Sequence, residues 1–425
     1  MLLKTSVTEK LMKNSIFRED PGHSRVEYIP TERRNKPVRI VLYSHDTMGM
    51  GHIRRNLLIA SSLVKEDLNV EALLISGTRE AAFFATEAGL DCITLPAISK
   101  DKLGGYSARH YDWSLEKTVQ LRSKIIAAAV EEFRPDLFIA DKIPLGIGGE
   151  LENALRSLKN HPTQCVLGLR DVLDEPPVVA REWIRDRYDA SIEEFYNELW
   201  IYGDRTIYDS IHEYAFPASI ASRAVFTGYL NQTKRTSCHT KQEIAPSSDL
   251  SQRPIVLCVV GGGQDGFELA KAFVQSQIPG GWKGILVTGP FMPKQDQQCL
   301  HALVGDRENI EIIDRLIETD DYMLNADRVV AMGGYNTVTS VLSFGKTALI
   351  VPRTRPRREQ WIRAERLANK GWLTSVDPDS LSPEIISNWL QDSNVPRPSP
   401  DGVDLQGLNR ITARVAHLCE HKATA

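Results

Sequence analysis

Residues 44–56 read SHDTMGMGHIRRN and join a run of strand length to a run with helical periodicity. The preceding PVRIVLY is apolar, as expected of a buried strand. Gly49 and Gly51 let the chain bend sharply and bring its backbone close to a ligand. A helix that begins near His52 points free N–H groups and a partial positive charge into the same space. The segment therefore predicts a ligand-binding turn that carries His52.

The chemistry of His52 has two interpretations. An imidazole has an ordinary pKa of about 6.5, so it can accept a proton from a hydroxyl group. The alternative is a histidine that only caps its helix. The motif is not that of the dinucleotide enzymes, because no third glycine follows at the required spacing. Asp46 and Asp141 both follow strand-like runs, and either is a candidate to orient His52 or to cap a helix.

Strand-like runs alternate with helical segments along most of the chain, which predicts parallel sheets covered by helices on both faces. The alternation stops in a polar stretch rich in Ser, Thr and Gln and restarts at PIVLCVV. We therefore expect an α/β protein of two facing, doubly wound, Rossmann-like domains with a ligand-binding cleft between them. The final helix is expected to cap the second domain or to pack back on the first. The expected divisions are a flexible arm at 1–36, a first domain at 37–228, a linker at 229–253, a second domain at 254–403, and a helix and tail at 404–425.

The composition is that of a soluble globular protein, with 42% hydrophobic and 25% charged residues. A chain of 425 residues exceeds one ordinary core, in agreement with two domains. The net charge of −4 gives no general attraction to nucleic acid. The six cysteines are scattered without a C-x-x-C pair, which favours a reducing compartment. No apolar run is long enough to span a bilayer, and no signal peptide is evident, so we expect a cytoplasmic protein.

Two further glycine turns follow strand-like runs in the second half. Residues 259–266, VVGGGQDG, lead into a helix, and N–H groups at such a helix start suit a diphosphate. The Lys-Ser/Thr of a P-loop does not follow, which disfavours ATP hydrolysis. Asp265 is unfavourable beside a phosphate and is a candidate helix cap. Residues 331–340, AMGGYNTVTS, place Gly333 and Gly334 at another helix start that suits an anion or a sugar.

Taken in order, these motifs resemble a GT-B glycosyltransferase, and most closely the peptidoglycan N-acetylglucosaminyltransferase group of family 28. GMGH resembles the N-terminal loop of that family, and GGGQDG resembles its phosphate loop. The series GGYNTVTS…FGKTALIVP…REQWIRAERLANKGW resembles its donor-binding signature, and the resemblance covers most of residues 38–390. It implies a hexosyltransferase-type enzyme that transfers a sugar from a nucleotide diphosphate sugar, with UDP-linked sugars among the candidates. It also implies no cofactor and no metal ion.

The resemblance assigns roles residue by residue. His52 matches the family's base or acceptor-orienting histidine, and Gln360 with Glu359 matches the pair that reads the donor sugar hydroxyls. Ser340 stands where the family carries a glutamate that grips the ribose. The expected catalytic residues are His52 and Asp46. The expected donor-binding residues are Gly261, Gly262, Gly263, Gln264, Arg315, Leu316, Gly333, Gly334, Asn336, Thr337, Ser340, Arg358, Glu359 and Gln360. The expected acceptor-side residues are Gly49, Gly51, Asp141, Arg170 and Asp171.

Three charged segments have both a functional and a structural interpretation. The arginine-rich run RTRPRREQWIRAER, residues 353–366, could neutralise a diphosphate, contact anionic lipid at a membrane surface or bind RNA, and a solvated helix is the alternative. Within it, Arg358 is the candidate for donor binding. Arg170 and Asp171 are expected to contact the acceptor or to form a salt-bridged loop. The D-x-D spacing at 377–379 is flanked by proline and favours a turn over a metal site.

Two other functions remain open at this point. GMGHIRR is also similar to a motif of nucleotide-sugar hydrolases of nonulosonate synthesis, in which water replaces the acceptor. The serine at the family's glutamate position favours a GT-B protein that binds a nucleotide sugar or a partner enzyme without catalysis. The expected partners are therefore a nucleotide-sugar donor and an acceptor that the sequence does not identify, without nucleic acid.

Overall fold

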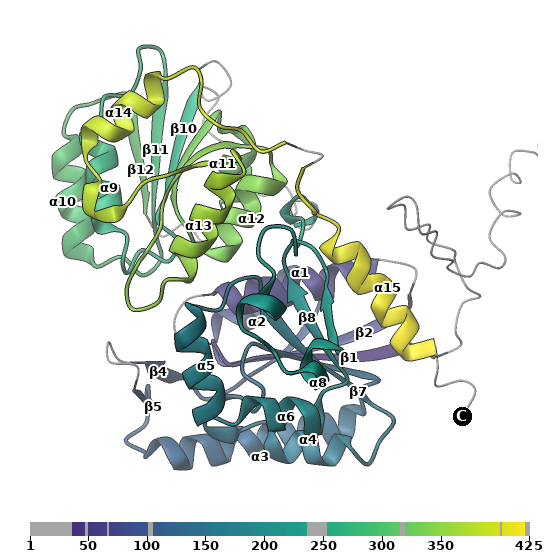
Figure 1. The fold of residues 1–425 in the computed structure, drawn as a ribbon. Helices are drawn as coiled ribbons and strands as arrows, with labels where there is room; N and C mark the ends of the chain where they lie inside the picture. Colours follow the sequence, from purple (N-terminus) through teal and green to yellow (C-terminus); the bar gives the residue numbers. More distant parts are fainter. Residues whose placement is uncertain are drawn as a thin grey trace, which may run out of the picture.

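The computed structural model describes residues 36–46, 50–65, 68–100, 105–235, 253–314, 319–399 and 402–420. The chain forms two lobes, each built on a parallel sheet (Figure 1). This confirms the expected α/β class and the pair of Rossmann-like domains. The domain limits given above stay predictions, and the arm and most of the linker fall outside the described residues.

The first sheet has seven strands in the order β3-β2-β1-β6-β7-β8-β9. Alternate residues of its inner strand β1 point to opposite faces, so Ile40 and Leu42 pack in one apolar cluster while Val41 and Tyr43 pack in another. Such two-sided burial is typical of a parallel sheet covered by helices. The strands are β1 (Val38–Ser44), β2 (Val70–Ser76), β3 (Asp91–Thr94), β6 (Leu137–Asp141), β7 (Gln164–Arg170), β8 (Glu198–Tyr202) and β9 (Ala224–Phe226).

The second sheet has six parallel strands in the order β12-β11-β10-β13-β14-β15, which repeats the pattern of the first. In both sheets the first strand lies between the second and the fourth of the sheet-forming strands, so each sheet has a topological switch point beside its first strand. The strands are β10 (Ile255–Val259), β11 (Lys283–Gly289), β12 (Ile310–Asp314), β13 (Arg328–Met332), β14 (Thr347–Val351) and β15 (Thr374–Ser375).

Helices cover the sheets, and a short antiparallel hairpin of β4 (Ile98–Lys100) and β5 (Tyr106–Ala108) extends from the first lobe. The helices of the first half are α1 (Gly51–Lys65), α2 (Glu80–Glu87), α3 (Leu115–Phe133), α4 (Glu152–Leu158), α5 (Pro176–Arg185), α6 (Tyr188–Phe195), α7 (Ser210–Glu213) and α8 (Ala218–Ala221). Those of the second half are α9 (Phe267–Gln275), α10 (Lys294–Val304), α11 (Asp320–Asn325), α12 (Tyr335–Ser343), α13 (Glu359–Asn369), α14 (Pro383–Gln391) and α15 (Gly407–Glu420). Short 3₁₀ helices occupy Ile147–Gly149, Gln232–Lys234 and Pro378–Ser380.

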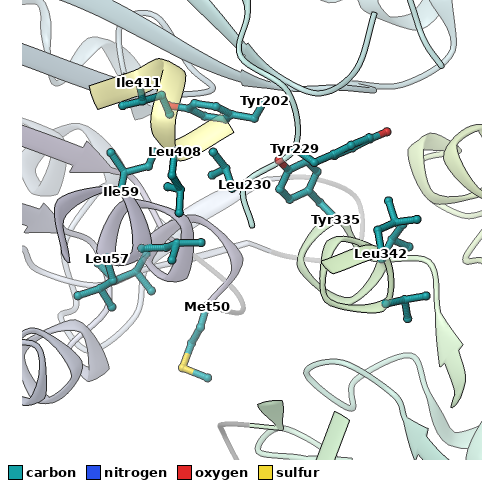
Figure 2. Close-up of a cluster of buried hydrophobic side chains, with 14 of the residues drawn as sticks. Met50, Leu57, Ile59, Tyr202, Tyr229, Leu230, Tyr335, Leu342, Leu408 and Ile411 are labelled. Carbon is teal, nitrogen blue, oxygen red and sulfur yellow. The ribbon is translucent and has the colours of Figure 1, made fainter. Parts of the chain in front are cut away.

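The last helix, α15, packs against the first lobe rather than the second. Leu408 and Ile411 lie beside Leu57 and Ile59 of α1 (Figure 2). The chain returns to the first lobe beside the segment by which it left that lobe, because Leu230 pairs with Gln406 in an isolated β-bridge. Of the two positions expected for the final helix, the structure therefore shows the one on the first domain. None of the helices in the described ranges combines the length and apolarity that crossing a membrane requires.

Candidate active site at the carboxyl ends of the two sheets

The carboxyl ends of β1 and β6 form the first side of the site. These strands are neighbours, and the helices α1 and α4 cover opposite faces of the sheet. Open parallel sheets bind ligands at the carboxyl ends of two strands related in this way. His52 of α1 and Asp141, the last residue of β6, meet there, with Nδ1 3.2 Å from Oδ2. The His52 side chain is 18% exposed and that of Asp141 is 1% exposed. A ligand can therefore reach the imidazole while the carboxylate stays buried behind it.

Arg55 completes this group from the next turn of α1. Its Nη2 atom lies 2.7 Å and 2.5 Å from the two carboxylate oxygens of Asp141, and 3.1 Å from Nδ1 of His52. Asp141 is the acceptor among the three, so we assign the imidazole proton to Nδ1, from which it is donated to Asp141. That tautomer leaves Nε2 of His52 as a proton acceptor.

The electrostatics keep His52 neutral and Asp141 charged. Burial lowers the pKa of His52 below its ordinary value, and the adjacent Asp141 opposes this shift. Burial would raise the pKa of Asp141, but Arg55 and His52 together bring it well below its ordinary value. A neutral imidazole paired with a carboxylate is the protonation state that a general base requires at neutral pH.

Asp46 holds the turn rather than the imidazole. Its Oδ1 atom accepts the backbone N–H of Ile53 at 3.3 Å, and its Oδ2 atom accepts the hydroxyl of Ser76 at 2.9 Å. These contacts anchor the start of α1 to the end of β2. His52 takes its carboxylate partner from Asp141, so of the two aspartates considered for orienting it, the structure shows Asp141. A catalytic role for Asp46 stays a prediction.

A buried ion pair supports the turn between β1 and α1. Arg122 of α3 and Glu150 are both fully buried and form a salt bridge, and Tyr43 donates its hydroxyl to Glu150. Arg122 also donates to the carbonyl oxygen of His45 at 3.4 Å. The ring of His45 lies 4.6 Å from that of His52 between centroids, and burial lowers its pKa well below the ordinary value. Burial thus favours the neutral form of both His45 and His52.

The loop after β10 forms the second side of the site. Gly261 and Gly263 have positive φ angles of +62° and +90°. A side chain at Gly263 would meet the Thr288 carbonyl oxygen at 2.3 Å, so only glycine fits there. Gly261, Gly262 and Gln264 are exposed, and α9 begins just beyond them without a side-chain cap. The loop therefore presents open backbone N–H groups to a ligand, as a diphosphate site requires.

Arg353 is the arginine that lies beside this loop. Its Nη1 atom donates to Asp265 at 2.9 Å and its Nη2 atom to Glu359 at 3.2 Å. Asp265 is therefore paired with an arginine, and the expectation that it caps α9 is wrong, since Gly266 occupies the cap position. The sequence placed the run 353–366 among the candidates to neutralise a diphosphate, but it did not predict that Arg353 pairs with Asp265 and Glu359.

The third glycine turn faces the first domain. Gly334 precedes α12 without a side-chain cap, and Thr337 lies half-buried on the first turn of that helix. Asn336 donates from Nδ2 to the carbonyl oxygen of Gly51 at 3.1 Å. The start of α12 thus meets the start of α1, which brings this glycine turn next to His52. Ser340 is buried one turn further along α12.

Glu359 and Gln360 stand together at the start of α13 and are both buried. Gln360 accepts the backbone N–H of Arg353 at 3.1 Å, and its backbone packs against Gly333. Burial would raise the pKa of Glu359, but nearby cations, Arg170 first among them, lower it below its ordinary value. Atoms Oε2 of Glu359 and Nε of Arg170 are buried and make no hydrogen bond within the described residues. A polar ligand bound beside these two unpaired atoms would satisfy their hydrogen bonding.

Three other arginines of 353–366, at positions 357, 358 and 366, contact the first domain. Arg357 pairs with Glu182 at 2.6 Å, and Arg366 pairs with Glu213 at 2.8 Å. Arg358, the candidate for donor binding, contacts Glu175 at 2.8 Å and its guanidinium lies 4.2 Å from the ring centroid of Trp361. Its guanidinium is thus engaged with the first domain, and donor contact by Arg358 stays a prediction.

Asp171 is engaged in the same way. It binds Arg363 of α13 at 2.6 Å, and both side chains are almost completely buried. Of the two interpretations of this residue, the structure shows the salt-bridged loop rather than an open acceptor contact. The roles of Arg55, Arg353 and Arg363 were not predicted individually, although Arg55 lies within GMGHIRR and Arg353 and Arg363 lie within the arginine-rich run 353–366.

Some expected residues cannot be placed. Gly49, Arg315 and Leu316 lie outside the described residues. Asp377 accepts the backbone N–H of Asp379 at 2.8 Å, as in the turn favoured from the sequence. In the part of the chain that the structure describes, no three His, Cys, Asp or Glu side chains group as a metal site would require.

Comparison with known proteins agrees with this architecture. Residues 256–404 match the glycosyltransferase family 28 C-terminal domain, and this match ends just before α15. An uncharacterized glycosyltransferase of Methanosarcina mazei is 21% identical over 359 residues, which cover 81% of this chain and 88% of the relative. The solved glycotransferase of kitacinnamycin superposes with a TM-score of 0.56 at 17% identity, covering 91% of this chain and 99% of that one. A solved UDP-N-acetylglucosamine 2-epimerase has a TM-score of 0.60 at 10% identity, covering 92% and 98%. The chain thus carries a glycosyltransferase family 28 C-terminal domain at residues 256–404, and its two domains together have the GT-B fold.

Proposed function

We propose that the protein transfers a sugar from a nucleotide diphosphate sugar to an acceptor hydroxyl, with His52 as general base. The observation that carries this proposal is the His52–Asp141 pair at 3.2 Å, placed next to the uncapped start of α12 by the Asn336–Gly51 contact. A proton acceptor from one domain and an anion-binding helix start from the other are the two parts that the reaction needs.

The donor is proposed to lie against the second domain. The open N–H groups of Gly261 and Gly262 and the start of α12 would hold the diphosphate, whereas the N–H of Gly263 donates to the carbonyl oxygen of Val260 at 3.2 Å. Arg353, beside the first of these loops, would add positive charge in place of a metal ion. Glu359 and Gln360 would contact the sugar hydroxyls, which would satisfy the unpaired Oε2 atom of Glu359.

The transfer step follows from this placement. Nε2 of His52 takes the proton of the acceptor hydroxyl, and the oxygen bonds to the anomeric carbon of the donor. The bond from that carbon to the diphosphate oxygen breaks, and the nucleoside diphosphate leaves with the electron pair. Asp141 stabilises the imidazolium that forms, as its low pKa allows. Arg170, on the first domain near Glu359, remains the proposed acceptor-side cation. A cytoplasmic location also remains a prediction.

Hydrolysis of the same donor is the second candidate. A water molecule on Nε2 of His52 would react in the same way, and the fold alone does not separate the two reactions. Release of nucleoside diphosphate that depends on an added acceptor alcohol supports transfer, whereas equal release without it supports hydrolysis. Donor binding with neither transfer nor hydrolysis would instead support a protein that binds the nucleotide sugar without catalysis.

Donor binding is tested by calorimetry on the full chain with UDP, GDP and TDP and with their sugar derivatives. Gly262 is exposed and a side chain there would contact only Phe291, so the loop accepts substitution. Gly262→Asp should weaken binding about 10-fold or more, since a like charge near a surface costs on the order of 1 kcal/mol or more. Gly262→Asn, of the same shape without the charge, should bind nearly as the parent does. Equal affinity in both variants would show that the diphosphate does not bind at this loop.

A further inference from the structure

The first residue of α12 lies between two buried arginines. The guanidinium of Arg55 lies 5.5 Å from the ring centroid of Tyr335, and that of Arg363 lies at the same distance. Tyr335 is almost completely buried and packs 6.3 Å from Tyr229 between ring centroids (Figure 2). Cation–π contacts of this kind gain strength when they are desolvated. The ring thus connects the second domain to Arg55, which holds Asp141 beside His52.

Arg363 fixes the other side of Tyr335. Its Nε and Nη2 atoms bind Asp171 of the first domain at 2.8 Å and 2.6 Å, and its Nη1 atom donates to the carbonyl oxygen of Gly333 at 3.1 Å. Tyr229 donates its hydroxyl to the same aspartate at 3.1 Å. One guanidinium therefore ties a carboxylate of the first domain to the backbone of the glycine turn that precedes α12. Because both charges are out of water, either alone would be unfavourable, so the pair exists only when the domains are docked.

These contacts form one path, His52–Asp141–Arg55–Tyr335–Arg363–Asp171, that crosses between the domains twice. Resting on the function proposed above, we propose that Tyr335 and Arg363 are positioning residues that couple docking of the second domain to the placement of His52 beside Asp141. When the domains separate, Tyr335 leaves Arg55, and water reaches the Arg55–Asp141 pair and the imidazole. His52 is then buried and paired with Asp141 only in the docked form, in which water is excluded from the donor.

The state of His52 reports this coupling without any donor. The charged or titratable groups that face it are His45 and Asp46 after β1, Asp141 at the end of β6 and Arg55 on α1, while α12 contributes the neutral Asn336. Burial is the largest influence on the pKa of His52, and it acts downward. Opening the domains should therefore raise the pKa toward the ordinary value, because the loss of burial outweighs the weakened contact with Asp141.

The test is an NMR titration of the full chain labelled with ¹⁵N-histidine, in which His52→Gln identifies the signal. Arg363→Met should raise the pKa of His52 by about one unit, and small-angle scattering should show a more extended chain. Arg366→Met is the matched control, since Arg366 lies one turn further on α13 and pairs across the domains in an exposed position. That variant should leave the titration unchanged. An unchanged titration in a folded Arg363→Met would overturn the coupling.

Tyr335 gives a second test if Arg363→Met does not fold. Tyr335→Phe keeps the ring and should titrate as the parent does, whereas Tyr335→Ala removes the contact with Arg55 and should raise the pKa of His52. Equal pKa values in both Tyr335 variants would contradict the proposal. This outcome is distinct from failure of the proposed function, because a chain that never transfers sugar would still show the shift if the coupling exists.

Discussion

Nδ1 of His52 lies 3.2 Å from Oδ2 of Asp141, although 89 positions separate the two residues along the chain. The sheet order explains the meeting, because β1 and β6 are neighbours, Asp141 is the last residue of β6, and His52 lies in the first turn of the helix that follows β1. The second sheet repeats this order, and its glycine turns follow the equivalent strands β10 and β13. Two switch points therefore supply the two halves of one site.

Replacing the aspartate should change both the rate and its pH dependence. Asp141 raises the pKa of His52, so Asp141→Asn should lower that pKa further below its ordinary value. The imidazole must be neutral to act as base, so the acidic limb of the kcat/KM profile should move to lower pH. Turnover at neutral pH should fall about 10- to 100-fold, because the base is weaker and its tautomer is no longer fixed. The measurement is a pH–rate profile, and Asp377→Asn in an exposed turn should reproduce the parent profile. A limb that moves to higher pH would contradict the assignment.

The glycines of the phosphate-like loop should differ in tolerance. Gly263→Ala places a methyl group against the Thr288 carbonyl oxygen at a position with φ of +90°, and should cost about 1–3 kcal/mol of stability. Gly261→Ala meets nothing within 4 Å, so only its positive φ counts, at about 1 kcal/mol. Urea unfolding of the two variants checks this order. A Gly261 variant that is the less stable of the two would show that the loop is arranged differently.

The ion pair below the turn should be essential for stability. Arg122→Met leaves Glu150 buried without its main partner, which should cost about 3–5 kcal/mol. Arg156→Met removes exposed pairs with Glu152 and Glu194 and should cost less than about 1 kcal/mol. Equal losses in a denaturant titration would mean that Arg122 is not buried as described.

Helix α15 should stabilise the first domain although it follows the second in sequence. Ile411 is 1% exposed and packs in the cluster that includes Leu57 of α1. Ile411→Ala should cost about 2–4 kcal/mol, measured by unfolding and followed at Trp200, which is buried in the first sheet. Arg410 pairs with Asp404 near the surface, and Arg410→Ala is the milder comparison. A loss confined to the second domain would contradict this packing.

Periodicity and glycine placement were sufficient to predict the fold. The runs PVRIVLY and PIVLCVV correspond to the strands β1 and β10 of the structure, and the alternation with helices implied parallel order. The strand β8 was not singled out, because NELWIY mixes a charged residue with a tryptophan. Local pattern therefore identified the elements that carry the site.

The partners of charged residues could not be predicted. Arg358 was expected at the donor, and Asp171 at the acceptor or in a salt-bridged loop, and neither partner across the domains, Glu175 or Arg363, was predicted. Such pairing depends on how two sheets distant in sequence dock, and no periodicity records that geometry. His52 was found because it lies within its motif, whereas the choice of Asp141 over Asp46 required the order of the strands.

The central claim is that His52 accepts the acceptor's proton, and turnover of His52→Ala with the donor identified by calorimetry tests it most directly. The account predicts a loss of about 100-fold or more in kcat, with donor affinity nearly unchanged, because the donor is held by the other domain. His52→Asn, which keeps a hydrogen bond but takes no proton at neutral pH, should lose as much. Full turnover in a folded His52→Ala would contradict the account.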